Sequence, residues 1–209
     1  MYIPHWFREE RLPVLHDLIR RHPFAPMITE VDGAPFATHL PFLLDPDRGA
    51  YGVLRGHMAR SNPQWRGFTD GKGTLVIFQG PHAYISTAWY AEPLAVPTWN
   101  YATAHVYGAP QCVDEAELRQ ILLDTVRTFE TAGAAPLPAD YFEKMMRGVV
   151  GFEVPISRIE GKFKLSQNRS DQDRHGVVKA LSASAGAEDR ATAECMRGTF
   201  EAPRPPDAE

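Results

Sequence analysis

The sequence has few of the features that mark secreted, membrane-bound or metal-stabilised proteins. Only two of its 209 residues are cysteines, Cys112 and Cys195, and neither belongs to a C-x-x-C pair. Their spacing predicts free thiols in a reducing compartment rather than a disulfide or a zinc site. No apolar run approaches the roughly 20 residues that span a bilayer. The first residues also lack the basic and apolar regions of a secretory signal, so we expect a cytoplasmic protein with no membrane partner.

An excess of positive charge is also missing. The chain has 22 lysines and arginines against 26 aspartates and glutamates, a formal net charge of −4. Nucleic-acid binding depends on cations that neutralise phosphates, so this composition argues against direct DNA binding. The clustered cations form two small groups, namely Arg8, Arg11, Arg20 and Arg21 in one, and Lys162, Lys164, Arg169 and Arg174 in the other.

What the sequence does contain is a succession of short apolar runs that predict strands. They cover residues 24–31, 35–44, 51–57, 74–79, 82–86 and 100–106. Turn residues such as Asp32-Gly33 and Asp70-Gly71 separate most of them, and we interpret Gly80-Pro81 as a further turn. Several short strands joined in this way predict an antiparallel barrel or sandwich, in a mainly β (α+β) protein.

Helices are predicted on either side of these strands. Leu12, Leu15, Leu18 and Ile19 recur at helical spacing, and the pattern ends at His22-Pro23. An insert at about 114–148 follows the strands. Asp114 begins its first helix, which we end at Gly133, and Asp140 begins a second that runs to Gly148. The long, proline-containing connection between the two is unlike the tight turn of a helix-turn-helix, so we interpret the pair as a structural cover.

The C-terminal part begins with another strand and another helix. Residues 151–156 return to strand character, and Ser170 caps a helix that reaches about Leu181. We therefore predict one domain over residues 1–181, containing the helical insert. Residues 182–209 are predicted as a linker, a short helix and a loose tail.

Residues 51–65 carry the most distinctive local pattern. An apolar run ends in GHMARSNPQW, where a cation, a hydroxyl and an amide precede a proline suited to the first turn of a helix. Backbone N–H groups at such a start, with Arg60 and Ser61 beside them, would bind a phosphate or another anion. The alternative is an ordinary helix start, in which Ser61 or Asn62 only caps the first N–H groups.

Polar residues interrupt several other strands. Thr38 and His39 lie within an apolar run, Trp99 and Asn100 lie at a strand start, and a dense polar run covers residues 159–169. Each feature taken alone is more typical of hydrogen-bonded core residues, packed aromatics or a half-exposed strand than of a ligand site. Their combination is more informative.

Together, these segments resemble one family, the PaiB-type FMN-binding negative transcriptional regulators. The similar segments are residues 1–4 (MYIP), 38–42 (THLPF), 56–60 (GHMAR), 62–65 (NPQW), 76–86 (VIFQGPHAYIS), 96–101 (VPTWNY) and 161–169 (GKFKLSQNR). The resemblance covers most of the chain, to about residue 181. It implies an FMN-binding split β-barrel, related to that of pyridoxamine phosphate oxidases, with FMN at the interface of a homodimer.

The resemblance also implies roles for particular residues. Arg60 and Ser61 would hold the FMN phosphate, with Asn62 and Gln64 nearby, and Arg60 would fork onto the dianion. Thr38 and His39 would meet the isoalloxazine edge or the ribityl chain. Across the dimer, Trp99 and Asn100 would close the ring pocket, and Lys164, Gln167 and Asn168 would contact flavin oxygens. No metal site and no catalytic residue is identified.

Two main functions remain open at this point. The first is a flavin-responsive regulator that acts as a homodimer. The second is a flavin-dependent oxidoreductase that acts on an unknown small molecule or a haem-like substrate, with the cofactor carrying the chemistry. A flavin carrier without turnover is a third reading. A family resemblance does not decide among them, because a fold hosts more than one function.

Overall fold

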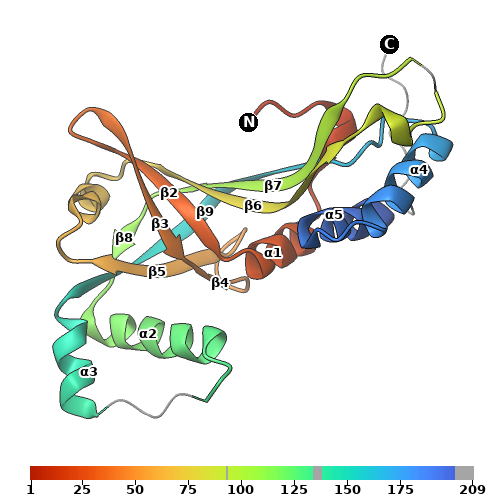
Figure 1. The fold of residues 1–209 in the computed structure, drawn as a ribbon. Helices are drawn as coiled ribbons and strands as arrows, with labels where there is room; N and C mark the ends of the chain where they lie inside the picture. Colours follow the sequence, from red (N-terminus) through yellow and green to blue (C-terminus); the bar gives the residue numbers. More distant parts are fainter. Residues whose placement is uncertain (93, 134–137, 201–209) are drawn as a thin grey trace. The chain divides into compact units, whose positions relative to one another are not determined.

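The computed structural model describes residues 1–92, 94–133 and 138–200 (Figure 1). Its elements are, in chain order, η1 (His5–Phe7), β1 (Arg8–Glu9), α1 (Leu12–Arg21), β2 (Phe24–Val31), β3 (Ala34–Pro41), β4 (Leu43–Asp45), β5 (Val53–Ala59), η2 (Pro63–Asp70), β6 (Thr74–Ile85), η3 (Thr87–Trp89), β7 (Thr98–Gly108), β8 (Gln111–Cys112), α2 (Glu115–Phe129), α3 (Ala139–Met146), β9 (Val149–Lys164), α4 (Asp171–Ser182) and α5 (Ala187–Arg197).

Across the described residues, these strands form a nine-stranded antiparallel sheet. Its order is β3-β2-β6-β7-β9-β5-β4, and β1 and β8 each pair with β9 as well. The sheet is open, with β3 and β4 at the two ends of this order, and the helices are peripheral to it. This arrangement is the mainly β split-barrel class that the sequence predicts.

The chain divides into two compact units. The first consists of residues 1–15, 79–104 and 160–209, and the second of residues 16–78 and 105–159. Strands β6, β7 and β9 each contribute residues to both units. Neither unit is therefore a continuous stretch of chain.

The second unit begins with a hairpin that the sequence specifies closely. β2 and β3 pair antiparallel, from Phe24 opposite Pro41 to Val31 opposite Ala34. Asp32 and Gly33 form the two-residue turn between them, with φ values of 52° and 75°. Two successive positive φ angles match a type I′ turn, for which Asp-Gly is a preferred sequence, so this expectation is confirmed.

Aromatic rings fill the core of the second unit. Phe42 contacts Phe78 and Phe152 edge-on, with ring centroids 5.8 and 6.1 Å apart, and all three side chains are fully buried. Gly56 faces Phe152 across the β5–β9 pair. A Cβ at Gly56 would lie 3.1 Å from Phe152 Cζ, so the absence of a side chain there leaves space for the ring.

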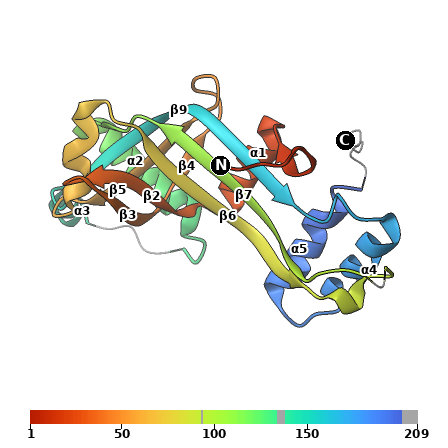
Figure 2. The same ribbon diagram turned by 90° about the horizontal axis from the view of Figure 1, so that it is seen from above.

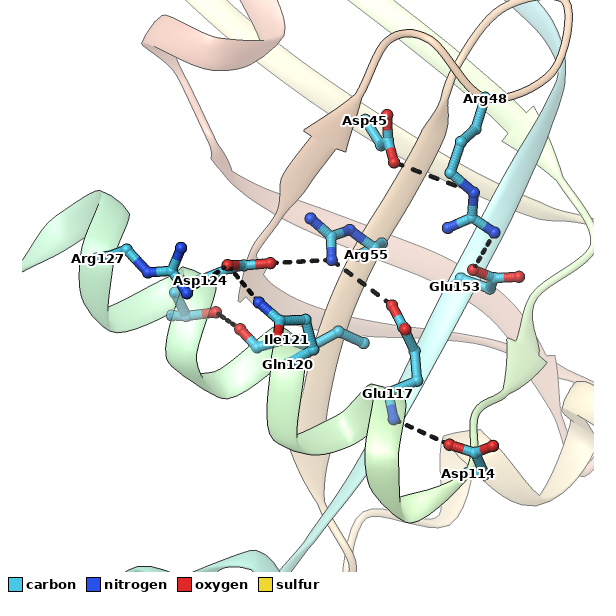
Figure 3. Close-up of polar contacts among 11 residues, drawn as sticks. Asp45, Arg48, Arg55, Asp114, Glu117, Gln120, Ile121, Asp124, Arg127 and Glu153 are labelled. Atoms are coloured by element: carbon cyan, nitrogen blue, oxygen red, sulfur yellow. Dashed lines mark hydrogen bonds and ion pairs between the residues drawn. The ribbon is translucent and has the colours of Figure 1, made fainter.

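The helical insert of the second unit is attached to β5 by an ion-pair network (Figure 3). Asp114 caps α2 by accepting from the backbone N–H of Glu117 at 2.9 Å, as the sequence predicts. Arg55 of β5 extends to two carboxylates of α2, Asp124 at 3.1 Å and Glu117 at 3.5 Å. The insert therefore contacts the sheet through charge as well as through the buried Leu118 and Ile121.

The first unit has a core of its own. Ile85, Leu165, Val177 and Leu181 are fully buried and pack with Ala193 and Met196 of α5. α4 and α5 lie side by side in both views (Figure 1, Figure 2). The predicted C-terminal helix is thus part of this core, whereas residues 201–209, predicted as a loose tail, lie outside the described residues.

Several local predictions differ from the structure. The run predicted as one strand over 35–44 forms two strands, β3 and β4, and the second helix of the insert ends at Met146 rather than at Gly148. Gly80-Pro81 is not a turn, because β6 runs unbroken through both residues, which are buried. The first helix of the insert ends at Phe129 rather than at Gly133, and Glu130 is already extended. The polar residues 159–164 extend β9 to Lys164 instead of following it.

Candidate functional site

Six of the predicted site residues lie in the second unit, on β3 and just after β5. They are Thr38, His39, Arg60, Ser61, Asn62 and Gln64, and we call them the β5-end cluster. β5 ends at Ala59, and η2 begins with Pro63 at its first position. Asn62 caps that helix, since its side chain accepts from the backbone N–H of Gln64 at 2.9 Å. The capping role considered from the sequence therefore belongs to Asn62, and Ser61 stays outside the cap.

Two amide side chains hold the cluster together. Asn62 Nδ2 donates to Thr38 Oγ1 at 2.9 Å. Gln64 is 1% exposed, and its Nε2 donates at 3.0 Å to both Met27 O and Thr29 Oγ1. These bonds fix the end of β5 against the β2–β3 hairpin. Gln64 is a supporting residue beneath the surface rather than a group that a ligand would touch.

Arg60 is held by the backbone that follows the insert. Its Nε donates to Arg147 O at 2.9 Å and its Nη2 donates to Val149 O at 2.8 Å. Its own backbone N–H bonds to Gly148 O at 2.8 Å. The guanidinium is exposed but fixed, because Nε and Nη2 on one of its edges already donate these two hydrogen bonds. Within the described residues Nη1 makes no bond, and Nη2 keeps its second hydrogen, so the Nη1–Nη2 end of Arg60 remains available to an anion.

The rest of the cluster presents polar groups to solvent. Ser61 is exposed, and no hydrogen bond of its hydroxyl occurs within the described residues. His39 is exposed too, and its ring stacks on Phe24 with centroids 6.1 Å apart. Arg60 and Ser61 thus expose a guanidinium and a hydroxyl where the backbone is well fixed, whereas His39 follows Thr38 on β3 and lies on the opposite face of that strand.

The remaining predicted residues, Trp99, Asn100, Lys164, Gln167 and Asn168, lie in the first unit. Lys164 Nζ donates to Thr98 Oγ1 and to Trp99 O, both at 2.6 Å. Burial lowers the pKa of Lys164, and the charges of Lys162 and Arg169 lower it further. This lysine therefore joins β9 to the start of β7, and its protonated form is less favoured than that of an exposed lysine.

Trp99 belongs to an exposed aromatic group that we call the aromatic face, formed by His82, Tyr84 and Trp99. Trp99 and Tyr84 meet edge-on with ring centroids 5.9 Å apart, and His82 lies 6.2 Å from Trp99. Trp99 is 53% exposed and Tyr84 is 49% exposed. Exposed aromatic clusters of this kind commonly mark interfaces or ligand sites.

Asn100 and Gln167 face inward instead. Asn100 is fully buried, and its Nδ2 donates to Ser166 Oγ at 2.9 Å. Gln167 accepts from the backbone N–H of Leu165 at 2.7 Å. Both side chains brace the turn at Ser166, which has a φ of 66°, a strained value for a non-glycine residue. Asn168 is exposed beside this turn.

His82 and Tyr84 were not among the predicted site residues, although both lie in the strand predicted over 82–86. Their spacing carried the signal, because residues two apart on a strand share a face. His57 was missed as well. It is half-buried on β5, burial lowers its pKa, and its Nδ1 has no hydrogen-bond partner within the described residues.

Comparison with known proteins identifies the family. A family model described as "Putative FMN-binding domain" matches residues 1–158. The chain is also 35% identical over 201 residues to the protease synthase and sporulation protein PAI 2 of Bacillus subtilis, an alignment that covers 94% of this chain and 96% of that protein. The chain belongs to the PaiB-type FMN-binding family. Its cofactor is FMN, as the resemblance implied.

Other relatives extend to fungi, and solved structures confirm the fold. An uncharacterized protein of Emericella nidulans is 30% identical over 226 residues, covering 87% of this chain and 90% of that protein. The flavocytochrome Anf3 of Azotobacter vinelandii has a TM-score of 0.62 at 15% identity, covering 82% of this chain and 75% of that one. An FAD- and haem-binding protein of Mycobacterium smegmatis has a TM-score of 0.59 at 18% identity, covering 79% and 78%.

The residues of the two groups fit the chemistry of FMN. The β5-end cluster includes a cation and hydroxyl groups, and none of its six members is a carboxylate, so its composition is compatible with a phosphate ester. The aromatic face offers exposed rings of the kind that cover a flavin ring. Among the residues that the structure describes, no cluster of three or more metal-ligating side chains occurs. No helix in the same set has the length and hydrophobicity to cross a bilayer.

Proposed function

We propose that this protein is a flavin-responsive regulator that works as a homodimer and holds the FMN phosphate at the β5-end cluster. The observation that carries the proposal is the fixed guanidinium of Arg60, which is followed in the chain by Ser61, also exposed. An arginine already held by two carbonyls loses little freedom when an anion binds, which favours affinity. Its remaining Nη1 and the Ser61 hydroxyl supply charge-assisted hydrogen bonds.

Thr38 and His39 would meet the ribityl chain or the ring edge. Thr38 Oγ1 accepts from Asn62, which leaves its hydroxyl hydrogen available for donation. When bound, FMN supplies reversible redox chemistry, and the side chains of this protein bind and orient it. We assign the cofactor a sensing role, in line with the regulator family that the sequence resembles.

A second copy of the chain would complete the site. The aromatic face leaves Trp99 and Tyr84 about half exposed, which is unusual for large rings that have no partner. Aromatic residues are enriched where subunits meet. We propose that the aromatic face of one chain covers the flavin ring held by the other, with Lys164 and Asn168 near the ring oxygens.

Regulation would not require the protein to contact DNA itself. Within the first unit, Arg8 pairs with Glu10 at 3.6 Å, Arg11 with Glu9 at 2.6 Å, and Arg169 with Glu92 at 3.9 Å. In the second unit Arg21 pairs with Asp17 at 2.9 Å. Cations neutralised by adjacent carboxylates contribute little to phosphate binding. These pairs support an indirect role through a protein partner or a small molecule.

The test is FMN binding, followed through the visible absorption of purified protein. Replacing Arg60 with Ala removes a contact worth about 1.5–3 kcal/mol, or roughly tenfold to a hundredfold in affinity. Ser61→Ala, which removes one exposed hydroxyl, should weaken affinity less. The matched control is Arg66→Ala, a nearby exposed arginine outside the cluster. Equal affinities in the Arg60 and Arg66 variants, both folded, would refute the phosphate assignment.

A second measurement separates the regulator from the oxidoreductase. The FMN-loaded protein is mixed with NADH or NADPH without oxygen, and the flavin absorbance is followed. For a sensor we expect the flavin absorbance to fall only slowly. When oxygen and candidate acceptors are then added, the protein should not oxidise more than one equivalent of NADH or NADPH. Rapid, repeated turnover would contradict the sensing role and establish the flavin-dependent enzyme instead.

A further inference from the structure

A cavity of about 520 Å³ lies within the second unit, apart from the β5-end cluster. It is bounded by the end of α1, the segment of β4 and the end of α2. Its volume falls in the range of small-molecule sites. Six apolar side chains form its wall, namely Ile19, Pro23, Phe42, Leu43, Leu44 and Phe129.

The polar lining of this cavity is rich in donors. Arg20, Arg55 and Arg127 line it together with one acid, Asp124 (Figure 3 shows the last three). Asp124 already has three partners. Its Oδ1 accepts from Gln120 at 2.9 Å and lies 3.3 Å from Arg127, and its Oδ2 accepts from Arg55 at 3.1 Å. Two of these partners are cations, so the charge of the carboxylate is already balanced within the protein.

The arginines do have capacity left. Arg55 is 16% exposed at its side chain and uses Nη1 for both of its acidic partners, so within the described residues its Nη2 makes no bond. Arg127 has only the exposed contact to Asp124, with 71% of its side chain exposed. For Arg20, no ion pair occurs among the residues that the structure describes. Three arginines and one aspartate line the cavity, and the aspartate is already paired with two of the arginines. The excess of positive charge favours an anionic head group.

We infer that this cavity binds a small monocarboxylate with an apolar body about the size of one aromatic ring. The carboxylate would lie against Arg20, Arg55 and Arg127, because guanidinium groups match its planar geometry. The body would lie on the wall, where Phe42 and Phe129 provide aromatic contacts. A ligand there would contact α1, β4 and the insert at once, and would thus stabilise the attachment of the insert.

The experiment is isothermal titration calorimetry on the full-length, FMN-loaded protein, with phenylacetate as the probe. Acetate tests the head group alone, and phenylacetamide tests the body without the charge. We expect one site per chain, with phenylacetate at least about tenfold tighter than either control, the loss expected when a charged contact or the apolar body is removed. Equal binding of acetate or of phenylacetamide would overturn the inference, as would no binding of phenylacetate at millimolar concentration.

Neighbouring arginines on α1 give a matched pair of variants. Arg20 lines the cavity, whereas Arg21 pairs with Asp17 and does not. Arg20→Gln should weaken phenylacetate binding about tenfold, while Arg21→Gln should leave it unchanged. Thr128→Trp, at an exposed position on the cavity rim, should abolish binding by filling the space. Unchanged flavin absorbance confirms folding in each case. Equal effects of the two glutamine variants, or full binding in Thr128→Trp, would refute the site.

Discussion

Asn62 and Thr38 join the end of β5 to the middle of β3. Asn62 Nδ2 donates to Thr38 Oγ1 at 2.9 Å, while Asn62 Oδ1 accepts from the backbone N–H of Gln64, also at 2.9 Å. An amide is a side chain that donates from one end and accepts at the other, which is what this position requires. The same residue thus begins η2 and holds the surface on which Arg60 and Ser61 lie.

Thr38→Val should separate these two roles. Valine has the shape of threonine but cannot accept from Asn62 Nδ2, and the cap made by Asn62 Oδ1 is left intact. We expect the free energy of unfolding, measured by urea denaturation, to fall by about 1 kcal/mol. Asn62→Ala should lose more, about 1–2 kcal/mol, because the cap is lost too. Ser61→Ala, the control, should stay within about 0.5 kcal/mol. A Thr38→Val protein as stable as the native one would show that the Thr38 bond contributes nothing.

Arg55 and Asp124 should be energetically coupled. Both side chains are mostly buried, at 16% and 20% exposure. A double-mutant cycle with Arg55→Met and Asp124→Asn should give a coupling energy of about 1–3 kcal/mol. A comparison cycle with Arg119→Met and Glu143→Gln, a more exposed pair, should give about 0–1 kcal/mol. Equal couplings in the two cycles would argue against Arg55 as the main attachment of the insert.

His57 should make the protein less stable in mild acid. Burial lowers its pKa, so its folded pKa lies below the value of about 6.5 that it takes in the unfolded chain. Between these two values the unfolded chain binds more protons, and the free energy of unfolding falls as the pH falls. The full contribution is present above about pH 6.5. His57→Gln should flatten this slope in urea denaturation at several pH values, and an unchanged slope in this variant would show that His57 is not its source.

Trp99 should contribute to self-association. We expect the native protein to sediment as a dimer at micromolar concentration. Trp99→Ala should raise the dimer dissociation constant about thirtyfold, the effect of losing a central interface aromatic of about 2 kcal/mol. Tyr141→Ala is the matched control, since Tyr141 is 51% exposed on α3, outside the aromatic face. A monomeric native protein that still binds FMN would contradict the homodimer.

The helices and turns could be predicted because their signals are local. Asp114 and Ser170 cap α2 and α4, and Asp32-Gly33 turns the β2–β3 hairpin, each within a few residues of the signal. The composition of the β5-end cluster was equally accessible, since four of its members lie within five consecutive positions. These four residues could be grouped because they are close together in the chain. Their geometry depends on the partners of Asn62 and Gln64 on the β2–β3 hairpin, which only the structure shows.

What could not be predicted depends on contacts between distant segments. The two carbonyls that hold Arg60 come from residues 87 and 89 positions later, so nothing local indicated that its guanidinium was fixed. The interior position of Asn100 depends on Ser166, 66 residues away. Gly80-Pro81 carries a strong local turn signal, but the pairing of a long strand overrides it, as tertiary context often does.

The interleaving of the two units has a consequence for how this protein can evolve. Each unit is assembled from separated stretches, and β6, β7 and β9 pass from one unit to the other within a single strand. A gene fusion moves contiguous segments, so neither unit can be inherited without the other. The same constraint applies to the C-terminal helix α5. It supplies Ala193 and Met196 to a core whose other members come from residues 83–85 and 165–181. The β5-end cluster and the helices that support the other unit therefore pass to descendants together, and they can be changed only by substitution or by insertion into loops.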